Sequence, residues 1–429
     1  MIDLTVLGGG AAGCRAAMLA ARAGFSVVLL EGGALGGAAA HEGYWAYRHL
    51  LRDAGAGENP YDLARENMRA ATETQVRAAR DTLRSLGVEI VRANGHVKGL
   101  RNRRYVVTTD DNFYESRRLL IAAGSIASAP DALDLEKARG DGMALSPRDL
   151  LNMPSAMKVL VLGGTLNDLR MAAWLAANKV SVTLSSPGER IAEELDGELC
   201  EWIKSSQRLG SVQYLTDAKL ASLGNRRAIV STLSGGQTVQ CERVILGGRR
   251  RPATRGIGLG HAAVAMDGAG AVITDLTCRT NLPDVYAAGD VNGRSQTALG
   301  AFLEAEVCVS NMLGEHRRMA YNALPSIFRC GFSCASVGDT EESAAAKNIR
   351  AVSVTVPVGG RHEDGFAKIL ADDGGRVIGA HLCHVYEGVS VIWALAGIIE
   401  KSGTARAAAR KIMPDSLLSD AVQQALLQF

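Results

Sequence analysis

The chain has few aromatic residues, few prolines and little net charge. Aromatic residues make up 5% of its 429 residues, prolines number 10, and the formal net charge is +2. So small a charge excludes a strongly basic nucleic-acid binder, because no domain-wide electrostatic footprint is visible. A hydrophobic fraction of 47% with 48 glycines is ordinary for an α/β protein and argues against disorder. The length predicts two to three domains with a large core.

Long apolar runs are also missing. The longest, residues 389–399, spans 11 residues and predicts a core helix that is too short to cross a bilayer. The chain begins with a predicted strand, residues 2–7, which leaves no room for a signal peptide. The eight cysteines show no paired spacing, which is typical of a reducing compartment. We therefore expect a cytoplasmic protein that binds neither membrane nor nucleic acid.

Two groups of cysteine and histidine residues could suggest a disulfide or a metal, and neither pattern is complete. Cys330 and Cys334 lie in a segment, residues 326–337, that reads as one strand, where four strand steps separate them by ~13 Å, beyond disulfide reach. His381, Cys383 and His384 lack the second half of a tetrahedral zinc site. We predict no metal site.

Arginines cluster at residues 101–104 and 249–251. The first interpretation is a solvated surface, and the alternative is a docking site for an acidic partner such as a carrier protein.

The first thirty-one residues have the pattern of a dinucleotide-binding unit. A predicted strand ends in Gly8-Gly9-Gly10-Ala11-Ala12-Gly13, a helix follows through residues 14–23, and a second strand, residues 26–30, ends at Glu31. Gly8 makes the tight turn, Gly10 lets the backbone approach a pyrophosphate, and Gly13 lets helix and strand pack closely. The helix N-terminus then faces the phosphates, and Glu31 can bind a ribose hydroxyl.

Later segments complete an α/β organisation. Residues 119–125 and 285–291 read as buried strands that end near a glycine, and a helix is predicted over residues 298–313. Asp290 can hold a ribitol hydroxyl there. A second strand-turn-helix-strand unit occupies residues 158–184, and after about residue 320 the pattern becomes α+β, with a last helix from residue 404 to the C-terminus.

Together these motifs resemble the flavoprotein disulfide reductases, the family of dihydrolipoamide dehydrogenase and mercuric reductase. The resemblance implies two Rossmann-like domains and a C-terminal α+β dimerisation domain: an FAD domain of residues 1–150 and 268–318, an inserted NAD(P)H-type domain of residues 151–267, and a homodimer formed through residues 319–429. The implied FAD contacts are Gly8, Gly10, Gly13, Glu31, Gly36, Gly37, Val97, Gly124, Gly289, Asp290 and Ala298.

The catalytic positions implied by the resemblance hold other residues in this chain. Where the family has a redox-active cysteine pair beside the flavin, this sequence has Ala39 and Tyr44, so no sulfur can relay electrons. The family lysine beside the flavin aligns with Arg48, and its glutamate partner aligns with Arg170. An ion pair is thus replaced by two positive charges, which Glu42 or a substrate acid has to compensate.

The second nucleotide motif and the C-terminal motif have changed as well. Residues 163–168 read Gly-Gly-Thr-Leu-Asn-Asp, in which Thr165 blocks close backbone approach and Asp168 puts a negative charge where pyrophosphate would lie. NAD(P)H binding is therefore predicted to be lost or severely weakened, the alternative being loose binding through unusual contacts. The family's C-terminal catalytic histidine is Met413, and only Asp420 can take the role of the glutamate that follows it.

Aromatic residues gather where the redox helix would lie against the flavin, namely Tyr44, Trp45 and Tyr47, with His41 and His49 nearby. They either fill the volume left by the lost motif or stack a planar substrate on the flavin, with Tyr44 or Tyr47 as acid or base. The predicted catalytic set is Tyr44, Tyr47, Arg48 and Asp420.

Three functions fit this sequence. The first is an FAD-dependent oxidase or dehydrogenase without a disulfide relay, acting directly on a small organic substrate of specialised biosynthesis that a carrier protein may present. The second is an NAD(P)H-dependent reductase of quinones or similar acceptors. The third is a non-catalytic FAD-binding scaffold.

Overall fold

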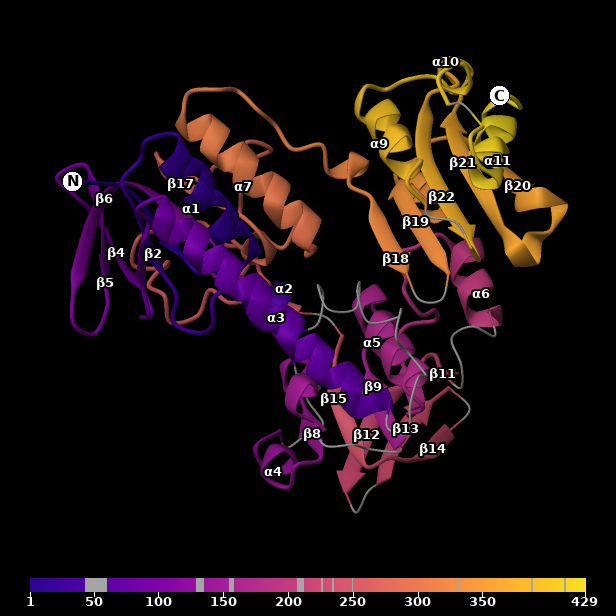
Figure 1. Ribbon diagram of the computed structural model, residues 1–429, viewed down its shortest axis with the longest axis horizontal. Coiled ribbons are helices and arrows are strands. Elements are labelled where there is room, and N and C mark those ends of the chain that lie inside the picture. The colour runs from indigo at the N-terminus through magenta and orange to yellow at the C-terminus, as the bar shows by residue number, and fades with distance from the viewer. Residues whose placement is uncertain are drawn as a thin grey trace.

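The computed structural model describes residues 1–42, 60–128, 135–153, 158–206, 212–224, 227–233, 235–248, 250–329, 332–386, 389–412 and 414–429. Within these ranges the chain forms three parts, each built around a sheet of five to seven strands, as Figure 1 shows. The predicted fold class is confirmed.

The first sheet contains both strands of the first dinucleotide-binding pattern, β1 and β2. Its strand order is β3-β2-β1-β6-β5-β4, and β17 pairs with β6 on the far side. The β1, β2, β3, β6 and β17 contacts are parallel, whereas β4 and β5 extend the sheet as antiparallel strands. The strands are β1 (Ile2–Leu7), β2 (Val27–Leu30), β3 (Glu89–Val91), β4 (His96–Arg101), β5 (Arg104–Thr108), β6 (Phe113–Ile121) and β17 (Val285–Ala287).

Helices from both halves of the chain cover this sheet. α1 (Ala11–Arg22) and α7 (Ala298–Met312) pack side by side, as Figure 1 shows, and their small residues allow close approach. Ala16, Ala17, Ala20 and Ala305 are fully buried between them and the sheet. Short α2 (Gly37–His41) and long α3 (Pro60–Ser85) follow β2.

The second sheet is entirely parallel and has the order β11-β10-β9-β15-β8. It carries α5 (Leu166–Ala177) and α6 (Gly197–Ser205), and an antiparallel three-stranded sheet, β12-β13-β14, lies beside it. The strands and small elements of this part are β7 (Ser125–Ala127), α4 (Leu135–Gly140), β8 (Ala144–Leu145), η3 (Pro147–Asn152), β9 (Lys158–Leu162), β10 (Ser181–Ser185), β11 (Val212–Leu215), β12 (Lys219–Gly224), β13 (Arg227–Thr232), β14 (Gly235–Gln240), β15 (Arg243–Leu246) and β16 (Arg250–Pro252).

The third sheet is antiparallel, with the order β18-β19-β22-β21-β20. Its elements, with the short helices before and within it, are η5 (Asp290–Asn292), η6 (Tyr321–Ala323), β18 (Ser326–Arg329), β19 (Ser333–Gly338), α8 (Glu341–Ala346), β20 (Ala351–Pro357), η7 (Val358–Gly360), η8 (His362–Asp364), β21 (Gly365–Asp372), β22 (Val377–His384), α9 (Ile392–Glu400), α10 (Ala405–Ala409) and α11 (Leu417–Leu426).

Two expected elements of this third part are wrong. Residues 326–337 form an antiparallel hairpin, with Phe328 opposite Cys334, and not one strand. The glycine at position 331 was the available turn signal. The predicted last helix is broken into α10 and α11, and Pro414 lies between them, where it disfavours helical backbone in the residue before it. The distance argument for Cys330 and Cys334 therefore loses its basis, although Cys330 lies outside the described residues.

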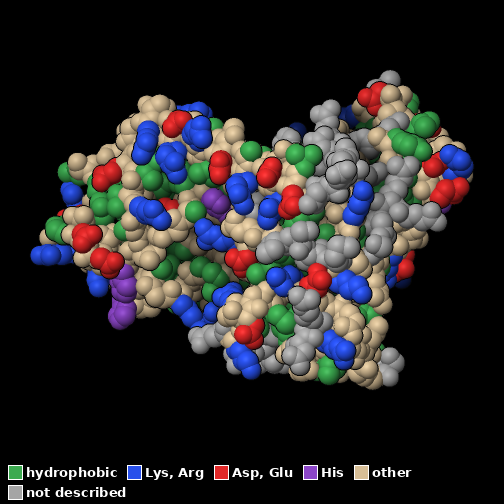
Figure 2. All heavy atoms as spheres, turned by 60° about the horizontal axis from the view of Figure 1, so that its bottom comes forward, with side chains coloured by type: hydrophobic (Ala, Val, Ile, Leu, Met, Phe, Trp, Pro, Cys, Tyr) green, Lys and Arg blue, Asp and Glu red, His purple; other side chains and the backbone are tan. Residues whose placement is uncertain are grey.

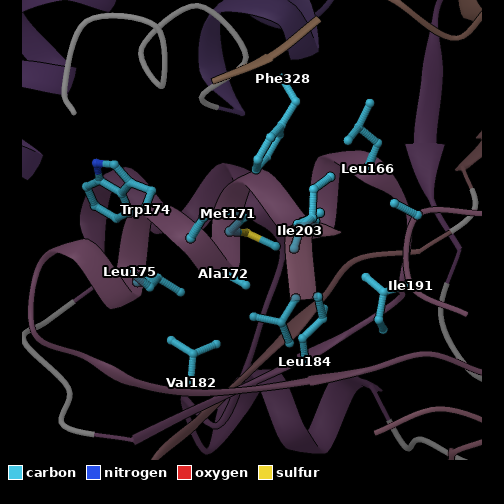
Figure 3. Close-up of a cluster of buried hydrophobic side chains, with 14 of the residues drawn as sticks. Leu166, Met171, Ala172, Trp174, Leu175, Val182, Leu184, Ile191, Ile203 and Phe328 are labelled. Atoms are coloured by element: carbon cyan, nitrogen blue, oxygen red, sulfur yellow. The ribbon is translucent and has the colours of Figure 1, made fainter. Parts of the chain in front are cut away.

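The core of the second sheet is shared with its neighbours. Tyr61 and Met68 of α3 and Phe328 of β18 join Trp174 and the other buried residues of α5 in one cluster. Figure 3 shows Phe328 pointing toward the α5 helix from the strand above it. The three parts of the chain are therefore held together by apolar packing as well as by covalent connection.

A buried polar network adds to this contact between the second and third sheets. The Lys368 ammonium of β21 lies 3.1 Å from Asp196 at the start of α6 and 2.8 Å from Glu341 of α8. The side chains of Lys368 and Asp196 are only 4% and 1% exposed. Outside this network, the face drawn in Figure 2 shows Lys and Arg side chains interspersed with Asp and Glu. Within the described residues, no helix is long and apolar enough to cross a membrane.

Candidate flavin site

The first glycine turn combines two crowded glycines with one open glycine. A Cβ atom at Gly13 would lie 1.8 Å from the Gly8 carbonyl oxygen, and one at Gly8 would lie 2.3 Å from the Ala122 oxygen. Gly8 also has a φ of +101°. At Gly10, by contrast, the described residues place no atom within 4 Å of where the Cβ would be, apart from its chain neighbours and the backbone of α1. Gly8 and Gly13 therefore allow strand and helix to pack, while Gly10 leaves its outer side free.

The N-terminus of α1 is not satisfied by a side chain. Its N-cap is Gly10, and no side-chain cap hydrogen bond is present. The first N–H groups of a helix have no partner within the helix and carry partial positive charge, so they bind anionic groups. An open glycine beside uncapped N–H groups fits the pyrophosphate of a dinucleotide.

Glu31 is fixed beside this turn by backbone donors. Its two carboxylate oxygens accept hydrogen bonds from the Gly9 N–H at 2.5 Å and the Gly33 N–H at 2.6 Å. The chain then returns over the turn, where Gly36 and Gly37 have φ values of +96° and +55°. A Cβ at Gly37 would lie 2.9 Å from the Gly10 Cα. Glu31 and the Gly36-Gly37 pair therefore lie beside the Gly8–Gly13 turn.

The second part of the predicted flavin site lies at the end of β17. Gly289 has a φ of +81°, and the following Asp290 accepts a 2.5 Å hydrogen bond from the Ser125 hydroxyl. Gly124, with a φ of +74°, is adjacent to Ser125. This arrangement brings residues from β6, β7 and β17 together at the carboxyl end of the first sheet, where α/β sheets bind ligands.

Arg250 is the residue that sequence reasoning misplaced. Its guanidinium donates to both Glu42 carboxylate oxygens, at 2.5 and 3.3 Å, and to the Ser125 hydroxyl at 2.7 Å, and it lies 3.8 Å from Asp290. The side chains of Arg250 and Glu42 are only 10% and 14% exposed. The prediction of a solvated surface for the 249–251 cluster is therefore wrong for Arg250, because a strand alternates its faces and turns this residue inward.

Glu304 is another buried charge that the sequence analysis missed. This α7 carboxyl is fully buried and accepts hydrogen bonds from the Gly289 N–H at 2.6 Å and the Asn292 amide at 3.0 Å. Burial raises its pKa from 4.5 to about 7. The sequence signal was a pair of glutamates, Glu304 and Glu306, in a mostly apolar helix, of which Glu306 pairs with Arg15 at its partly exposed side chain. Glu304 fixes the backbone of the turn that precedes Asp290.

The second glycine turn is filled by the protein itself. The Asp168 carboxylate accepts hydrogen bonds from the Thr165 N–H at 2.9 Å, the Thr165 hydroxyl at 2.6 Å and the Gly248 N–H at 2.9 Å. Glu194 reaches the Leu166 N–H at 3.3 Å. Asp168 is 3% exposed, and burial raises its pKa to about 6. Two carboxyl groups thus take the donors that a pyrophosphate would use.

The loop after β10 closes the same turn from outside. The Ala192 N–H donates to the Gly164 carbonyl at 2.6 Å, and a Cβ at Gly164 would lie 2.3 Å from the Ser186 hydroxyl oxygen. A side chain and a loop therefore lie against the backbone that has to stay accessible for a dinucleotide. Gly164 corresponds to Gly9 of the first turn, where a Cβ would also be crowded, at 2.8 Å from the Leu35 side chain. The two turns differ one residue later, where the first has the open Gly10 and the second has Thr165.

The remaining predicted site residues fall in three groups. Tyr44, Tyr47 and Arg48 lie outside the described residues, as do Trp45, His49, Glu387 and Met413. Asp420 is half-buried in the first turn of α11 and accepts a 2.7 Å hydrogen bond from Gln424. Ala298 begins α7 behind its N-cap Thr297, while Val97 is fully buried in β4 and its N–H donates to Ile257.

Arg170 and Ala39 can also be placed. The Arg170 guanidinium donates to Asn167 at 2.7 Å and to the Ile327 carbonyl at 2.6 Å, which joins α5 to β18. Glu42, which was expected to compensate Arg48 and Arg170, pairs with Arg250, and Arg48 lies outside the described residues. Ala39, the first position of the family's cysteine pair, is buried in α2.

Comparison with known proteins identifies the family from the whole length of the chain. Residues 2–305 match the family model described as pyridine nucleotide-disulphide oxidoreductase, and residues 324–426 match the dimerisation domain of that family. The chain belongs to the pyridine nucleotide-disulphide oxidoreductases. It is therefore a member of a family of FAD-dependent oxidoreductases with a dimerisation domain that supports a homodimer.

Relatives in this family are similar over most of their length. A dihydrolipoyl dehydrogenase of Chlamydia muridarum is 25% identical over 411 residues, which cover 88% of this chain and 87% of that protein. A mercuric reductase of Streptomyces lividans is 29% identical over 416 residues, covering 89% and 86%.

Solved structures of this oxidoreductase family share the fold. LpdA from Mycobacterium tuberculosis superposes with a TM-score of 0.85 at 20% identity and covers 100% of this chain and 99% of that one. The HOCl-induced flavoprotein disulfide reductase RclA from Escherichia coli gives a TM-score of 0.83 at 19% identity, with 99% of each chain covered. At these identities the likeness shows the fold alone.

Proposed function

We propose that this pyridine nucleotide-disulphide oxidoreductase relative is an FAD-dependent oxidase or dehydrogenase that acts directly on an organic substrate, without a dithiol relay and without NAD(P)H. The observation that carries the proposal is the contrast between its two glycine turns. The first turn is open at Gly10 and uncapped, whereas the donors of the second are used by Asp168 and Glu194.

Electrostatics favour the same conclusion. A helix N-terminus stabilises one or two negative charges, and α5 already has the Asp168 and Glu194 carboxyl groups there. A pyrophosphate would have to displace Glu194 and lie against Asp168, whose hydrogen bonds to Thr165 and Gly248 would then be lost. Repulsion between like charges adds to that cost.

The absence of a relay is supported by the sequence. No cysteine occurs between Cys14 and Cys200, so the segment after α2 has no thiol to offer. Cys14 itself is buried in α1, and burial raises the pKa of its thiol to about 12, which keeps it protonated and unreactive. Two electrons therefore have to pass between substrate and cofactor without a protein sulfur.

We infer binding roles around the cofactor from the positions of the described residues. Gly10 and the α1 N-terminus would hold the pyrophosphate, Glu31 a ribose hydroxyl, and Asp290 with Ser125 the polyol chain. When bound, FAD would accept two electrons from the substrate and pass them on to dioxygen. Arg250, neutralised by Glu42 and close to Asp290, holds this end of the site in place. We propose Tyr44, Tyr47 and Arg48, with Asp420 of the second subunit, as the groups that contact the substrate.

The substrate of the proposed reaction is a small organic molecule. We infer this class of molecule from the aromatic residues at positions 44, 45 and 47, which can stack a planar ring. Presentation by an acidic carrier protein would use the arginine clusters at residues 101–104 and 249–251. Arg250 is unavailable for such docking, because its guanidinium is bound inside the flavin site.

The test is an anaerobic titration of the purified yellow holoprotein with NADH and then with NADPH, followed by candidate organic substrates. We expect the flavin absorbance to persist with both nucleotides and to bleach with a substrate. Bleaching by NADH or NADPH within turnover time would refute the proposal and support a quinone-type reductase. Persistent absorbance with every electron donor, when the protein is reducible by dithionite, would support an FAD-binding scaffold instead.

A further inference from the structure

A surface cleft of about 350 Å³ is formed by the end of β16, the residues that follow it and the loop at residues 266–270. Its lining residues are Arg251, Pro252, Thr254, Arg255, Met266, Asp267, Gly268, Ala269 and Gly270. Because side chains of a strand point alternately to opposite faces, Arg250 lies inside with Glu42 while Arg251 lies outside. Neighbouring arginines thus face two different sites.

The two walls of the cleft are tied together. The Thr254 hydroxyl donates a 2.7 Å hydrogen bond to the Gly270 carbonyl, and Met266 and Val272 form an isolated antiparallel bridge in the opposite wall. The Ala253 N–H also donates to the Gly124 carbonyl at 2.9 Å, which fixes the first wall to the sheet. The cleft is therefore a preformed feature of the fold rather than a gap between loose segments.

Charge in this cleft is unbalanced toward positive. Arg251 and Arg255 are both exposed, and within the described residues neither guanidinium has an ion pair or a side-chain hydrogen bond. The one acid, Asp267, turns back on its own loop, where one carboxylate oxygen accepts from the Ala269 and Ala271 N–H groups at 2.9 and 2.8 Å. Two fixed positive charges face one carboxylate that is already hydrogen-bonded.

The floor of the cleft is apolar. Pro252 is buried, Met266 is 37% exposed, and Ala269 completes the surface between the arginines and the glycine loop. Guanidinium groups bind phosphate through paired N–H donors, and a thioether with a proline ring offers contact to an apolar body. A volume of about 350 Å³ falls in the range of small-molecule sites.

We propose that this cleft binds an organic phosphate, an anion whose phosphate group pairs with Arg251 and Arg255 and whose apolar part lies on Pro252 and Met266. The residues that line this cleft are different from those described for the flavin site. This proposal goes beyond the proposed function and does not depend on it.

The experiment measures binding to the oxidised holoprotein by titration calorimetry, with phenyl phosphate as the probe. Phenol and inorganic phosphate serve as probes that lack the charge or the apolar body. Arg251→Gln and Arg255→Gln are compared with Arg22→Gln, an exposed arginine at the end of α1 that serves as the matched control. Melting temperature and flavin content confirm that every variant is folded.

We expect phenyl phosphate to bind the wild type at least tenfold more tightly than phenol or phosphate does. Each cleft variant should weaken phenyl phosphate binding at least tenfold, and Arg22→Gln should leave it unchanged. Equal binding by the wild type and both cleft variants would overturn the proposal, as would a wild type that does not distinguish phenyl phosphate from phenol. Since flavin reduction is not measured here, a failed nucleotide titration leaves this result intact, and the reverse also holds.

Discussion

Replacing Gly10 by alanine should separate flavin binding from folding. Among the described residues, a Cβ at this position meets no atom within 4 Å apart from its chain neighbours and the backbone of α1, and its φ of −76° is normal for alanine, so the apoprotein loses little stability. The methyl group would occupy the side on which the backbone approaches the pyrophosphate. We expect FAD affinity to fall at least tenfold, which corresponds to about 1.4 kcal/mol of binding free energy.

Gly13→Ala is the opposite case at the same turn. Its Cβ would lie 1.8 Å from the Gly8 carbonyl oxygen, a backbone atom that can move only if α1 shifts away from β1. Overpacking of this kind costs about 1–3 kcal/mol or more. Gly140→Ala, with open space and an ordinary φ on exposed α4, is the control for a harmless substitution.

The assay measures the FAD-to-protein ratio after purification, the Kd for FAD by fluorescence quenching, and the urea midpoint of each apoprotein. The expected pattern is a stable Gly10→Ala variant with weak FAD binding and a destabilised Gly13→Ala variant. If Gly10→Ala bound FAD as tightly as Gly140→Ala, the first turn would not be the pyrophosphate site, and the reasoning from open and crowded glycines would fail.

Three further predictions follow from buried charges. Lys368→Met should lower the free energy of unfolding by about 3–5 kcal/mol, because it leaves the buried Asp196 carboxylate unpaired. The double variant Lys368→Met with Asp196→Asn should recover part of that loss, as measured by urea unfolding followed through Trp202 fluorescence. Equal losses in the single and double variants would argue against a stabilising ion pair. The pKa of Glu304 is about 7 in the folded protein and 4.5 in the unfolded chain, so the unfolded chain releases its proton first as pH rises. The free energy of unfolding should therefore fall by about 3 kcal/mol between pH 4.5 and pH 7. Glu304→Gln should remove this pH dependence, and an unchanged dependence would contradict the raised pKa of Glu304. Asp168→Asn should cost about 1–3 kcal/mol, because all three donors converge on one carboxylate oxygen and a neutral amide oxygen is a weaker acceptor than a charged one. A melting temperature equal to that of the wild type would show that this capping is weak.

Local motifs allowed much of the fold to be predicted from the sequence. The strand-turn-helix units at residues 2–30 and 158–185 carry glycine turns and apolar periods that determine their own structure, and both were found. The hairpin of β18 and β19 was missed because its alternating pattern runs through the turn, so only a single glycine marked it. The pairing of β19 with β22, which is distant in the sequence, cannot be recognised from a short stretch of residues.

The candidate site was less predictable for the same reason. The spacing of Gly10 and Gly13 in the motif predicts their positions in the turn. Arg250, in contrast, is held by Glu42, which is 208 residues away in the sequence. A run of three arginines predicts an exposed segment, but the alternation of side chains along β16 turns Arg250 toward the interior. Glu194, which covers the Leu166 N–H, comes from a loop after β10 that has no motif of its own. Contacts of this kind require the folded chain.

The shared core around Trp174 bears on how such a chain can change over evolutionary time. Because Tyr61, Met68 and Phe328 from outside the second sheet pack into its interior, deletion of that sheet would expose apolar surface on both of its neighbours. The second sheet therefore contributes to the stability of the whole molecule, whether or not its glycine turn binds a dinucleotide. Mutations in its glycine turn can then accumulate as long as they keep the helix and strand together, as Asp168 does.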